Sequence, residues 1–141
     1  MARAKQIDII VSFLMESGVR MLLSDLKAAL QRGVRIRILT GNYLGITQPS
    51  ALYLLKKELG DKVELRFYSD KGRSFHPKSY ILHYDTMSEI YIGSSNISRS
   101  ALTSGIEWNY RFNNNQDSQN FNLFYETFED LFKNHSYVIN D

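Results

Sequence analysis

The sequence contains no cysteine, and this absence excludes a disulfide framework and any metal site built from thiolates. It also lacks an N-terminal signal peptide and an apolar run long enough to span a bilayer. We therefore expect a cytoplasmic protein that is not embedded in a membrane.

Neither sign of charge is in large excess, because 17 Lys and Arg residues face 15 Asp and Glu residues and leave a net charge of +2. This balance does not by itself predict nucleic-acid binding, so a binding surface must come from local clustering. A length of 141 residues with 43% hydrophobic content is ordinary for one globular domain. We expect a single domain over residues 1–141, as a piece of a larger protein.

Strand and helix patterns alternate along the first half of the chain, and a hairpin, a further strand and a closing helix follow. Short apolar runs or apolar–polar alternation predict strands at residues 6–14, 34–40, 63–68, 78–84, 89–94 and 107–112. Helical spacing of apolar residues predicts helices at 18–32, 50–59 and 121–132, with a short helical turn at 98–102. This order predicts an α/β fold, a mixed β-sheet flanked by helices on both faces.

Several side chains are assigned to faces by the same patterns. Arg35 and Arg37 alternate with isoleucines, and we expect them on a solvated strand face. His83 is expected to point outward from its hairpin, with a role in supporting a site as the alternative. His135, near the end of the last helix, is expected to compensate the helix dipole. The aromatic residues within 121–132 are expected to pack in the core.

Two groups of polar residues point to chemistry. His76 and Lys78 are two residues apart on a predicted strand, so both project to one face while Pro77 faces away. After the next strand, a turn containing Ser94 and Asn96 offers a hydroxyl, a carboxamide and backbone N–H groups to anionic oxygens. A nucleophile or base, a fixed cation and neutral donors together indicate a phosphate-handling site.

These residues carry a resemblance to a known family. His76-x-Lys78 with Gly93-Ser94-x-Asn96 resembles the HxKxxxxD…GSxN signature of the phospholipase D superfamily, and Glu107 supplies a downstream acid. From the first strand to Trp108 the chain is similar to the phospholipase D-like nuclease domain attached to some bacterial helicase-like proteins. The resemblance implies a phospholipase D-like fold.

The chain departs from the signature at one position. Where the family has its Asp, this sequence has His83, with Asp85 two residues later. The interval from Lys78 to Gly93 is also longer than the family pattern. In the family this Asp usually supports the catalytic residues and does not itself take part in the reaction. Its loss therefore affects the support of the site more than the chemistry of the site.

The resemblance implies a role for each matching residue. His76 would be the nucleophile and form a covalent phosphohistidine, which water or another hydroxyl attacks in a second step. Lys78 would hold a non-bridging phosphate oxygen as a point charge. Ser94 and Asn96 would donate hydrogen bonds to the same phosphate. Glu107 would accept a hydrogen bond from the other ring nitrogen of His76 and so orient the ring.

A complete site in this family uses two such motifs, and this chain has one. We therefore expect a homodimer in which two His76 residues meet across a two-fold axis, the second serving as general acid. No metal ion and no other cofactor is needed in this scheme, because Lys78 and its symmetry mate supply the charge.

The first functional hypothesis is a metal-independent phosphodiesterase that acts on nucleic acid, with DNA as the expected substrate, as a nuclease module of a larger helicase-like or restriction-type protein. Lys71, Arg73 and Arg99 flank the motif and either contact DNA phosphates or are solvated loop charges. A phospholipid-acting phospholipase D is a second hypothesis, although the sequence has no membrane anchor. A third is a non-catalytic nucleic-acid-binding or dimerisation module, which the missing Asp and the longer hairpin favour.

Overall fold

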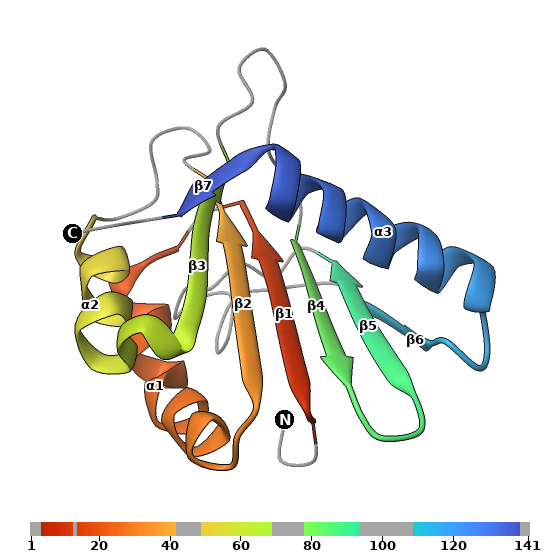
Figure 1. Cartoon of the computed structure of the whole chain (residues 1–141), viewed down its shortest axis with the longest axis horizontal. Coiled ribbons are helices and arrows are strands. Elements are labelled where there is room, and N and C mark those ends of the chain that lie inside the picture. Colours follow the sequence, from red (N-terminus) through yellow and green to blue (C-terminus); the bar gives the residue numbers. More distant parts are fainter. Residues whose placement is uncertain (1–3, 13, 42–48, 69–77, 94–108, 139–141) are drawn as a thin grey trace.

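One β-sheet with helices on both of its faces forms the body of the molecule in a computed structural model, which describes residues 4–12, 14–41, 49–68, 78–93 and 109–138 (Figure 1). The strands are β1 (Gln6–Val11), β2 (Arg35–Thr40), β3 (Val63–Tyr68), β4 (Lys78–His83), β5 (Ser88–Gly93), β6 (Asn109–Asn113) and β7 (Ser136–Val138). The helices are α1 (Glu16–Gln31), α2 (Pro49–Leu59), α3 (Ser118–Asn134) and a short 3-10 helix, η2 (Gly60–Lys62).

Within the described residues the sheet has seven strands, in the order β6-β5-β4-β1-β2-β3-β7. The three strands β1, β2 and β3 are parallel, as expected for strands joined by crossover helices. The strands β4, β5, β6 and β7 each run antiparallel to the neighbours with which they pair. The predicted α/β class with a mixed sheet is therefore confirmed.

The two faces of the sheet bury separate apolar clusters. Helices α1 and α2 cover one face, and α3 crosses the other face obliquely (Figure 1). The cluster under α1 and α2 includes Ile7, Ile9, Val11, Ile36, Ile38, Val63, Leu65, Val19, Leu26 and Leu55. The cluster under α3 contains Ile10, Leu39, Ile81, Ile90, Phe121, Phe128 and Phe132. Alternation along each strand sends successive side chains to opposite clusters.

Helix ends follow local signals in the sequence. Gly33 and Gly60 have φ values of 83° and 63°, a left-handed conformation that glycine adopts without strain after a helix. At the start of α3 the carboxylate of Asp117 accepts a hydrogen bond from the backbone N–H of Asn120, 3.1 Å away. Helix α2 begins at Pro49, one residue before the predicted start, because proline fits the first helical turn.

The aromatic residues of α3 divide between core and surface. Phe121, Phe128 and Phe132 are buried as predicted, but Phe124 is 40% exposed. Leu123 beside it is also exposed. The prediction of a wholly buried aromatic stripe is therefore wrong at Phe124, which lies at the edge of the buried face of the helix. No helix in the described ranges is both long enough and apolar enough to cross a membrane.

Candidate active site

One edge of the sheet gathers the strand ends that flank the predicted motif. Lys78, the first residue of β4, pairs with Val11, the last residue of β1, and Val11 also pairs with Thr40 at the end of β2. The last residue of β5, Gly93, pairs with Asn109 at the start of β6. This edge therefore contains the carboxyl ends of the parallel strands, where ligands bind in open α/β sheets.

Of the residues predicted to handle phosphate, Lys78 is the one that the structure describes. It is partly buried and begins β4 at this edge. The other predicted catalytic and phosphate-binding residues, and the predicted nucleic-acid contacts, lie outside the described residues: His76, Ser94, Asn96, Glu107, Lys71, Arg73 and Arg99. They belong to the connections 69–77 and 94–108, which link strands whose described ends lie at this edge.

Two hydroxyl groups near Lys78 are buried without a hydrogen-bond partner in the described part of the chain. They are Oγ1 of Thr40 and Oγ of Ser79. Val11 of β1 pairs with Lys78 on one side and with Thr40 of β2 on the other, so Thr40 lies two strands away from Lys78. Ser79 follows Lys78 along β4. A buried polar group without a partner costs about 1–3 kcal/mol.

His83 does not point outward, and this prediction is wrong. Its side chain is 19% exposed, and its Nε2 lies 2.8 Å from Oδ2 of Asp8 on the neighbouring strand. Because a carboxylate only accepts, Nε2 donates this hydrogen bond, and Nδ1 lies 3.0 Å from the hydroxyl of Ser88. The ring also meets Tyr125 of α3 edge-on, with ring centroids 5.1 Å apart. His83 thus joins β1, β4, β5 and α3.

The position of His83 along β4 decides between its two possible roles. It ends the strand that Lys78 begins, so the two residues are five strand positions, or about 16 Å, apart. At the position of the family's Asp, this chain therefore has the imidazole of His83, which is hydrogen-bonded to the carboxylate of Asp8 on β1. The pair supports the sheet at the end away from Lys78.

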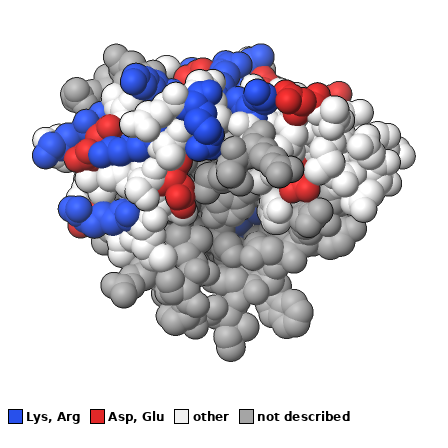
Figure 2. Space-filling model, turned by 90° about the horizontal axis from the view of Figure 1, so that it is seen from below, with Lys and Arg blue, Asp and Glu red and all other residues white. Residues whose placement is uncertain are grey.

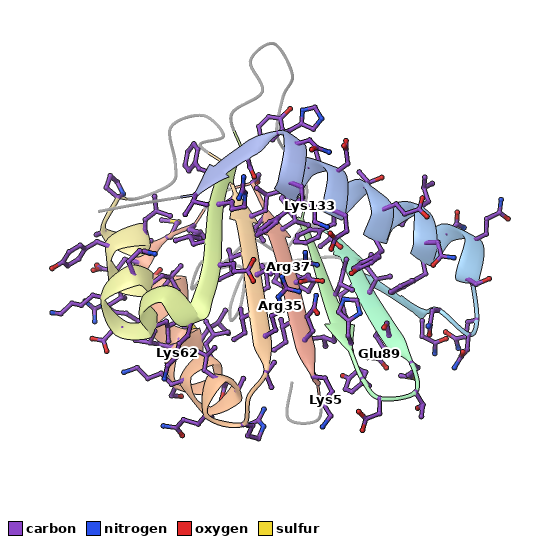
Figure 3. All side chains as sticks on the ribbon, in the orientation of Figure 1. Lys5, Arg35, Arg37, Lys62, Glu89 and Lys133 are labelled. Atoms are coloured by element: carbon purple, nitrogen blue, oxygen red, sulfur yellow. The ribbon has the colours of Figure 1, made fainter. Side chains whose placement is uncertain are left out.

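The prediction that Arg37 lies on a solvated strand face is also wrong, because only 2% of its side chain is exposed. Its Nε and Nη2 donate to the two carboxylate oxygens of Asp8 at 2.7 and 3.0 Å. Nη2 also pairs with the carboxylate of Glu129 on α3. The guanidinium lies over the rings of Phe128 and Phe132, 5.0 and 5.2 Å from their centroids. The face of β2 that carries Arg37 is covered by α3, not by solvent (Figure 3).

These contacts shift the pKa values of Asp8, Glu129 and Arg37. Burial alone raises the pKa of Asp8, but hydrogen bonds from His83 and Arg37 outweigh it and lower that pKa. For Glu129 the same balance, with Arg37 and Lys133 as the partners, lowers the pKa to about 2. Burial acts against the charge of Arg37, yet its two carboxylate partners raise its pKa. All three groups are therefore charged at neutral pH.

The patterns in the sequence did not predict this network of buried charges, although the sequence contains one sign of it. Asp8 stands inside the apolar run of residues 6–14, and charged residues are almost never fully buried unless they are paired. A partner for Asp8 was therefore required. Arg37 is at the matching position of the next predicted strand, and Asp8 and Arg37 are register partners in the parallel pair of β1 and β2.

Charge at the opposite end of the sheet is mixed. Figure 2 views the molecule from the amino ends of β1, β2 and β3 and shows Lys and Arg side chains interleaved with Asp and Glu. Several are paired there, among them Lys27 with Glu58 at 2.8 Å and Arg35 with Glu64 at 3.0 Å. The described charges at this end do not form a surface of one sign that would attract a polyanion.

The described residues contain no group of three or more His, Asp or Glu side chains that could hold a metal ion. His135 is the residue at the end of α3, and its expected role in compensating the helix dipole stays a prediction. It follows the last residue of α3, and its Nε2 lies 3.3 Å from a carboxylate oxygen of Asp130. Neither observation concerns the edge of the sheet that contains Lys78.

The fold is an α/β domain in which the carboxyl ends of the parallel strands lie at the same edge of the sheet as Lys78. A family model described as cardiolipin synthase, PLD-like domain, matches residues 1–132 of the chain. The chain belongs to this phospholipase D-like family. Members of the phospholipase D superfamily are phosphodiesterase-type enzymes, which places the chain among proteins of phosphoryl-transfer chemistry.

Solved structures with the same fold come from proteins of different activities. Polyphosphate kinase from Porphyromonas gingivalis matches 99% of this chain with a TM-score of 0.74 and 14% identity, and the match covers 20% of that protein. NucT from Helicobacter pylori matches 98% with a TM-score of 0.68 and 16% identity, covering 84% of NucT.

A third solved structure, the phosphatidylserine synthase of Haemophilus influenzae Rd KW20, matches 96% of the chain. Its TM-score is 0.64, the identity is 18%, and the match covers 34% of that protein. This chain therefore spans about a fifth of the kinase and a third of the synthase. No curated protein matches the sequence significantly. At these identities the likeness to the solved structures establishes the fold.

Proposed function

We propose that the chain is a metal-independent phosphodiesterase that cleaves nucleic acid, with DNA as the substrate. His76 is the nucleophile and Lys78 holds a non-bridging oxygen of the scissile phosphate. The observation that carries the proposal is the position of Lys78 at the start of β4, beside the carboxyl end of β1, in a chain of the phospholipase D-like family. This is the edge at which α/β sheets bind ligands.

The reaction runs in two displacements. A ring nitrogen of His76 attacks phosphorus, an N–P bond forms, and the bond from phosphorus to the leaving oxygen breaks. The leaving oxygen takes a proton from His76 of the second copy of the chain, which is the partner in the proposed homodimer. Water then attacks the phosphohistidine, gives its proton to the partner's His76, and releases His76 unchanged. Lys78 stabilises the negative charge on the equatorial oxygens in both steps.

Neutral groups complete the proposed site. Ser94 and Asn96 donate hydrogen bonds to the phosphate, and Glu107 accepts from the second ring nitrogen of His76 to hold its direction. Lys71, Arg73 and Arg99 contact the phosphates on either side of the cleaved bond. These roles follow the match of this sequence to the HxK and GSxN patterns.

The proposed enzyme works as a homodimer, because one chain supplies one motif and the reaction uses two histidines. We place it in the cytoplasm as a module of a larger helicase-like or restriction-type protein. The structural neighbours support modular use of the fold, since the matching part makes up 20% of the polyphosphate kinase and 34% of the phosphatidylserine synthase.

Cleavage of single- and double-stranded DNA in excess EDTA tests the proposal. The wild type is expected to cleave, and His76→Ala is expected to lose cleavage. His135→Ala is the matched histidine control, because His135 caps α3 and is expected to leave the rate unchanged. Activity that disappears in EDTA, or persists in His76→Ala, contradicts the proposed mechanism. DNA binding that weakens with salt but gives no cleavage indicates a non-catalytic module.

The dimer has a separate test. Light scattering is expected to give twice the 16.4 kDa mass of the chain. A mass of 16.4 kDa at every concentration contradicts a site shared between two copies.

A phospholipid substrate is the second candidate, because the matching family model is described as a cardiolipin synthase. Leu123 and Phe124 expose apolar surface on α3, which a lipid surface can cover. Flotation with phosphatidylglycerol vesicles separates the two candidates. Binding to vesicles and hydrolysis of the lipid, without cleavage of DNA, favours the phospholipase.

A further inference from the structure

Three side chains at the hairpin end of β4 and β5 form a chain of hydrogen bonds outside the proposed phosphate site. Nδ1 of His83 lies 3.0 Å from Oγ of Ser88, and Nε2 of His83 lies 2.8 Å from Oδ2 of Asp8. Ser88 begins β5 directly opposite His83, at the end of β4 away from Lys78 (Figure 1). A hydroxyl, an imidazole and a carboxylate in this order are the arrangement that activates a serine nucleophile.

The direction of these hydrogen bonds fits that chemistry. A carboxylate only accepts, so Nε2 of His83 carries the proton that it donates to Asp8. In the neutral imidazole Nδ1 is then the acceptor, and the hydroxyl of Ser88 donates to it. His83 can therefore take the proton of Ser88 when the serine oxygen attacks an electrophile. The carboxylate of Asp8 stabilises the imidazolium that forms, as in hydrolytic triads.

Each member of this group is held in place by its neighbours. Oδ1 of Asn114 accepts from the backbone N–H of Ser88 at 3.1 Å, and the backbone N–H of Asn114 donates to the carbonyl of Ser88 at 3.0 Å. The ring of His83 packs edge-on against an aromatic ring of α3. Asp8 is fully buried and is hydrogen-bonded through both carboxylate oxygens to Arg37. The three side chains are therefore positioned before any reagent binds.

The hydroxyl and the imidazole are both reachable from solvent. Ser88 is only partly buried, and 19% of the His83 side chain is exposed, whereas Asp8 is inaccessible behind them. The backbone N–H of Ser88 is bonded to Asn114, so it does not serve as an oxyanion donor. We therefore expect Ser88 to be modified by a reactive ester and to keep the adduct, without rapid turnover.

We propose that Ser88 is a second nucleophilic site of this protein, at which the hydroxyl attacks activated phosphonic and carboxylic esters with His83 as general base. The inference goes beyond the proposed function and does not depend on it, since it uses none of the residues of the phosphate site. With a phosphonofluoridate ester, a bond forms between Oγ of Ser88 and phosphorus, the P–F bond breaks, and fluoride leaves. The hydroxyl proton moves to Nδ1 of His83. Asp8 is a positioning residue that acts through His83.

Labelling with a biotinylated phosphonofluoridate ester tests the site. The His76→Ala chain is used, so that the proposed nucleophile of the phosphate site is not present. We expect a single adduct, which peptide mass spectrometry locates on Ser88, because a serine without a base partner is a weak nucleophile. Ser88→Ala is expected to abolish the adduct. Ser118→Ala is the matched control, since Ser118 is exposed at the start of α3, and it is expected to keep the adduct.

Substitution of the base separates activation of Ser88 from its exposure. His83→Gln keeps a polar side chain at this position but removes the group that takes the proton. We expect adduct formation to slow at least about 100-fold, the lower range of what a general base contributes. Circular dichroism checks that the variant is folded.

The proton on the ring of His83 gives a readout that a merely structural role of Asp8 would not move. Nitrogen-15 NMR of the wild type at pH 8 is expected to show Nε2 protonated and Nδ1 unprotonated. In Asp8→Asn the amide can donate to Nε2, so the proton is expected on Nδ1 and labelling of Ser88 is expected to be lost. A loss of stability alone would leave the proton on Nε2.

Several outcomes overturn the inference. A folded chain that forms no adduct, an adduct that remains in Ser88→Ala, or equal labelling rates with and without His83→Gln each exclude an activated serine. A proton on Nδ1 in the wild type also excludes it, because this nitrogen could not then accept from Ser88. Failure here is distinct from failure of the proposed function, since cleavage of DNA in EDTA depends on His76 and labelling of Ser88 does not.

Discussion

Arg37 of β2 and Asp8 of β1 form a two-point ion pair under α3, with nitrogen–oxygen distances of 2.7 and 3.0 Å. Both side chains are almost completely buried, and Glu129 reaches Arg37 from the helix above. The apolar layer between α3 and the sheet therefore contains a charged centre. Because burying a charge is costly, this arrangement holds only while every partner is present.

Arg37→Ala is the first prediction. Removing Arg37 leaves the carboxylate of Asp8 buried without its main cation, and breaking a buried pair costs about 3–5 kcal/mol. We expect the free energy of unfolding, measured in urea, to fall by this amount. Arg35→Ala on the same strand is the control, because Arg35 is exposed and its pair with Glu64 is worth at most about 1 kcal/mol. Equal losses in the two variants contradict the importance of the buried pair.

Acid sensitivity is the second prediction. The folded-state pKa of Glu129 is lowered from its usual 4.5 to about 2, and that of Asp8 is also lowered. A lowered pKa means that the unfolded chain takes up protons first as the pH falls. The stabilisation is therefore complete above about pH 5 and is lost as the pH falls from there towards 2 and below. Urea unfolding over this range is expected to show a steady decline.

Glu129→Gln is expected to flatten the acid limb of this profile while lowering stability at pH 7. Glu126→Gln on the same helix is the control, because Glu126 is exposed. If the two variants keep the same acid limb as the wild type, Glu129 does not set the acid sensitivity.

The unpaired hydroxyl of Thr40 gives the third prediction. Thr40 is completely buried and Oγ1 has no partner in the described part of the chain, so valine of similar shape removes a desolvated polar atom. We expect Thr40→Val to raise the free energy of unfolding by about 1 kcal/mol. Thr127→Val is the control, because its hydroxyl donates to the carbonyl of Leu123 at 2.8 Å. A loss of stability in Thr40→Val indicates that the hydroxyl has a partner in the folded protein.

The sequence predicted the strands well where the local pattern is sufficient. Residues 63–68 alternate apolar and polar side chains, and β3 spans Val63–Tyr68 as predicted. The three-residue strand β7 was missed because it is too short to show a pattern. It exists because α3 ends beside β3, and Arg66 of β3 donates to the hydroxyl of Ser136 at 2.7 Å.

Burial of polar residues was the part that the local pattern could not supply. Alternation correctly put Arg37 on the face opposite Ile36 and Ile38, but it contains no information about which helix covers that face. The same reason explains His83, whose partner Asp8 is 75 residues away in sequence. The place of Lys78 on a strand could be predicted because the strand pattern is local. Its role at a phosphate site stays a prediction, as do the roles of the other motif residues, which lie outside the described ranges.

Lys78→Ala is the last prediction and tests the described residue of the proposed site. Removing one group that stabilises the transition-state charge typically costs about 10²–10³ in rate. We expect the rate of DNA cleavage in EDTA to fall by this factor, while the free energy of unfolding changes little because Lys78 is only partly buried. Lys78→Arg is expected to restore part of the rate, since the charge is kept but the geometry differs.

Lys62→Ala is the matched control, because Lys62 is exposed in η2, before the start of β3 and away from the edge that contains Lys78. If general attraction of DNA to positive charge explained the effect, both alanine variants would weaken binding alike and the loss would shrink at high salt. A loss confined to Lys78→Ala and unchanged by salt instead assigns the lysine to the reacting phosphate.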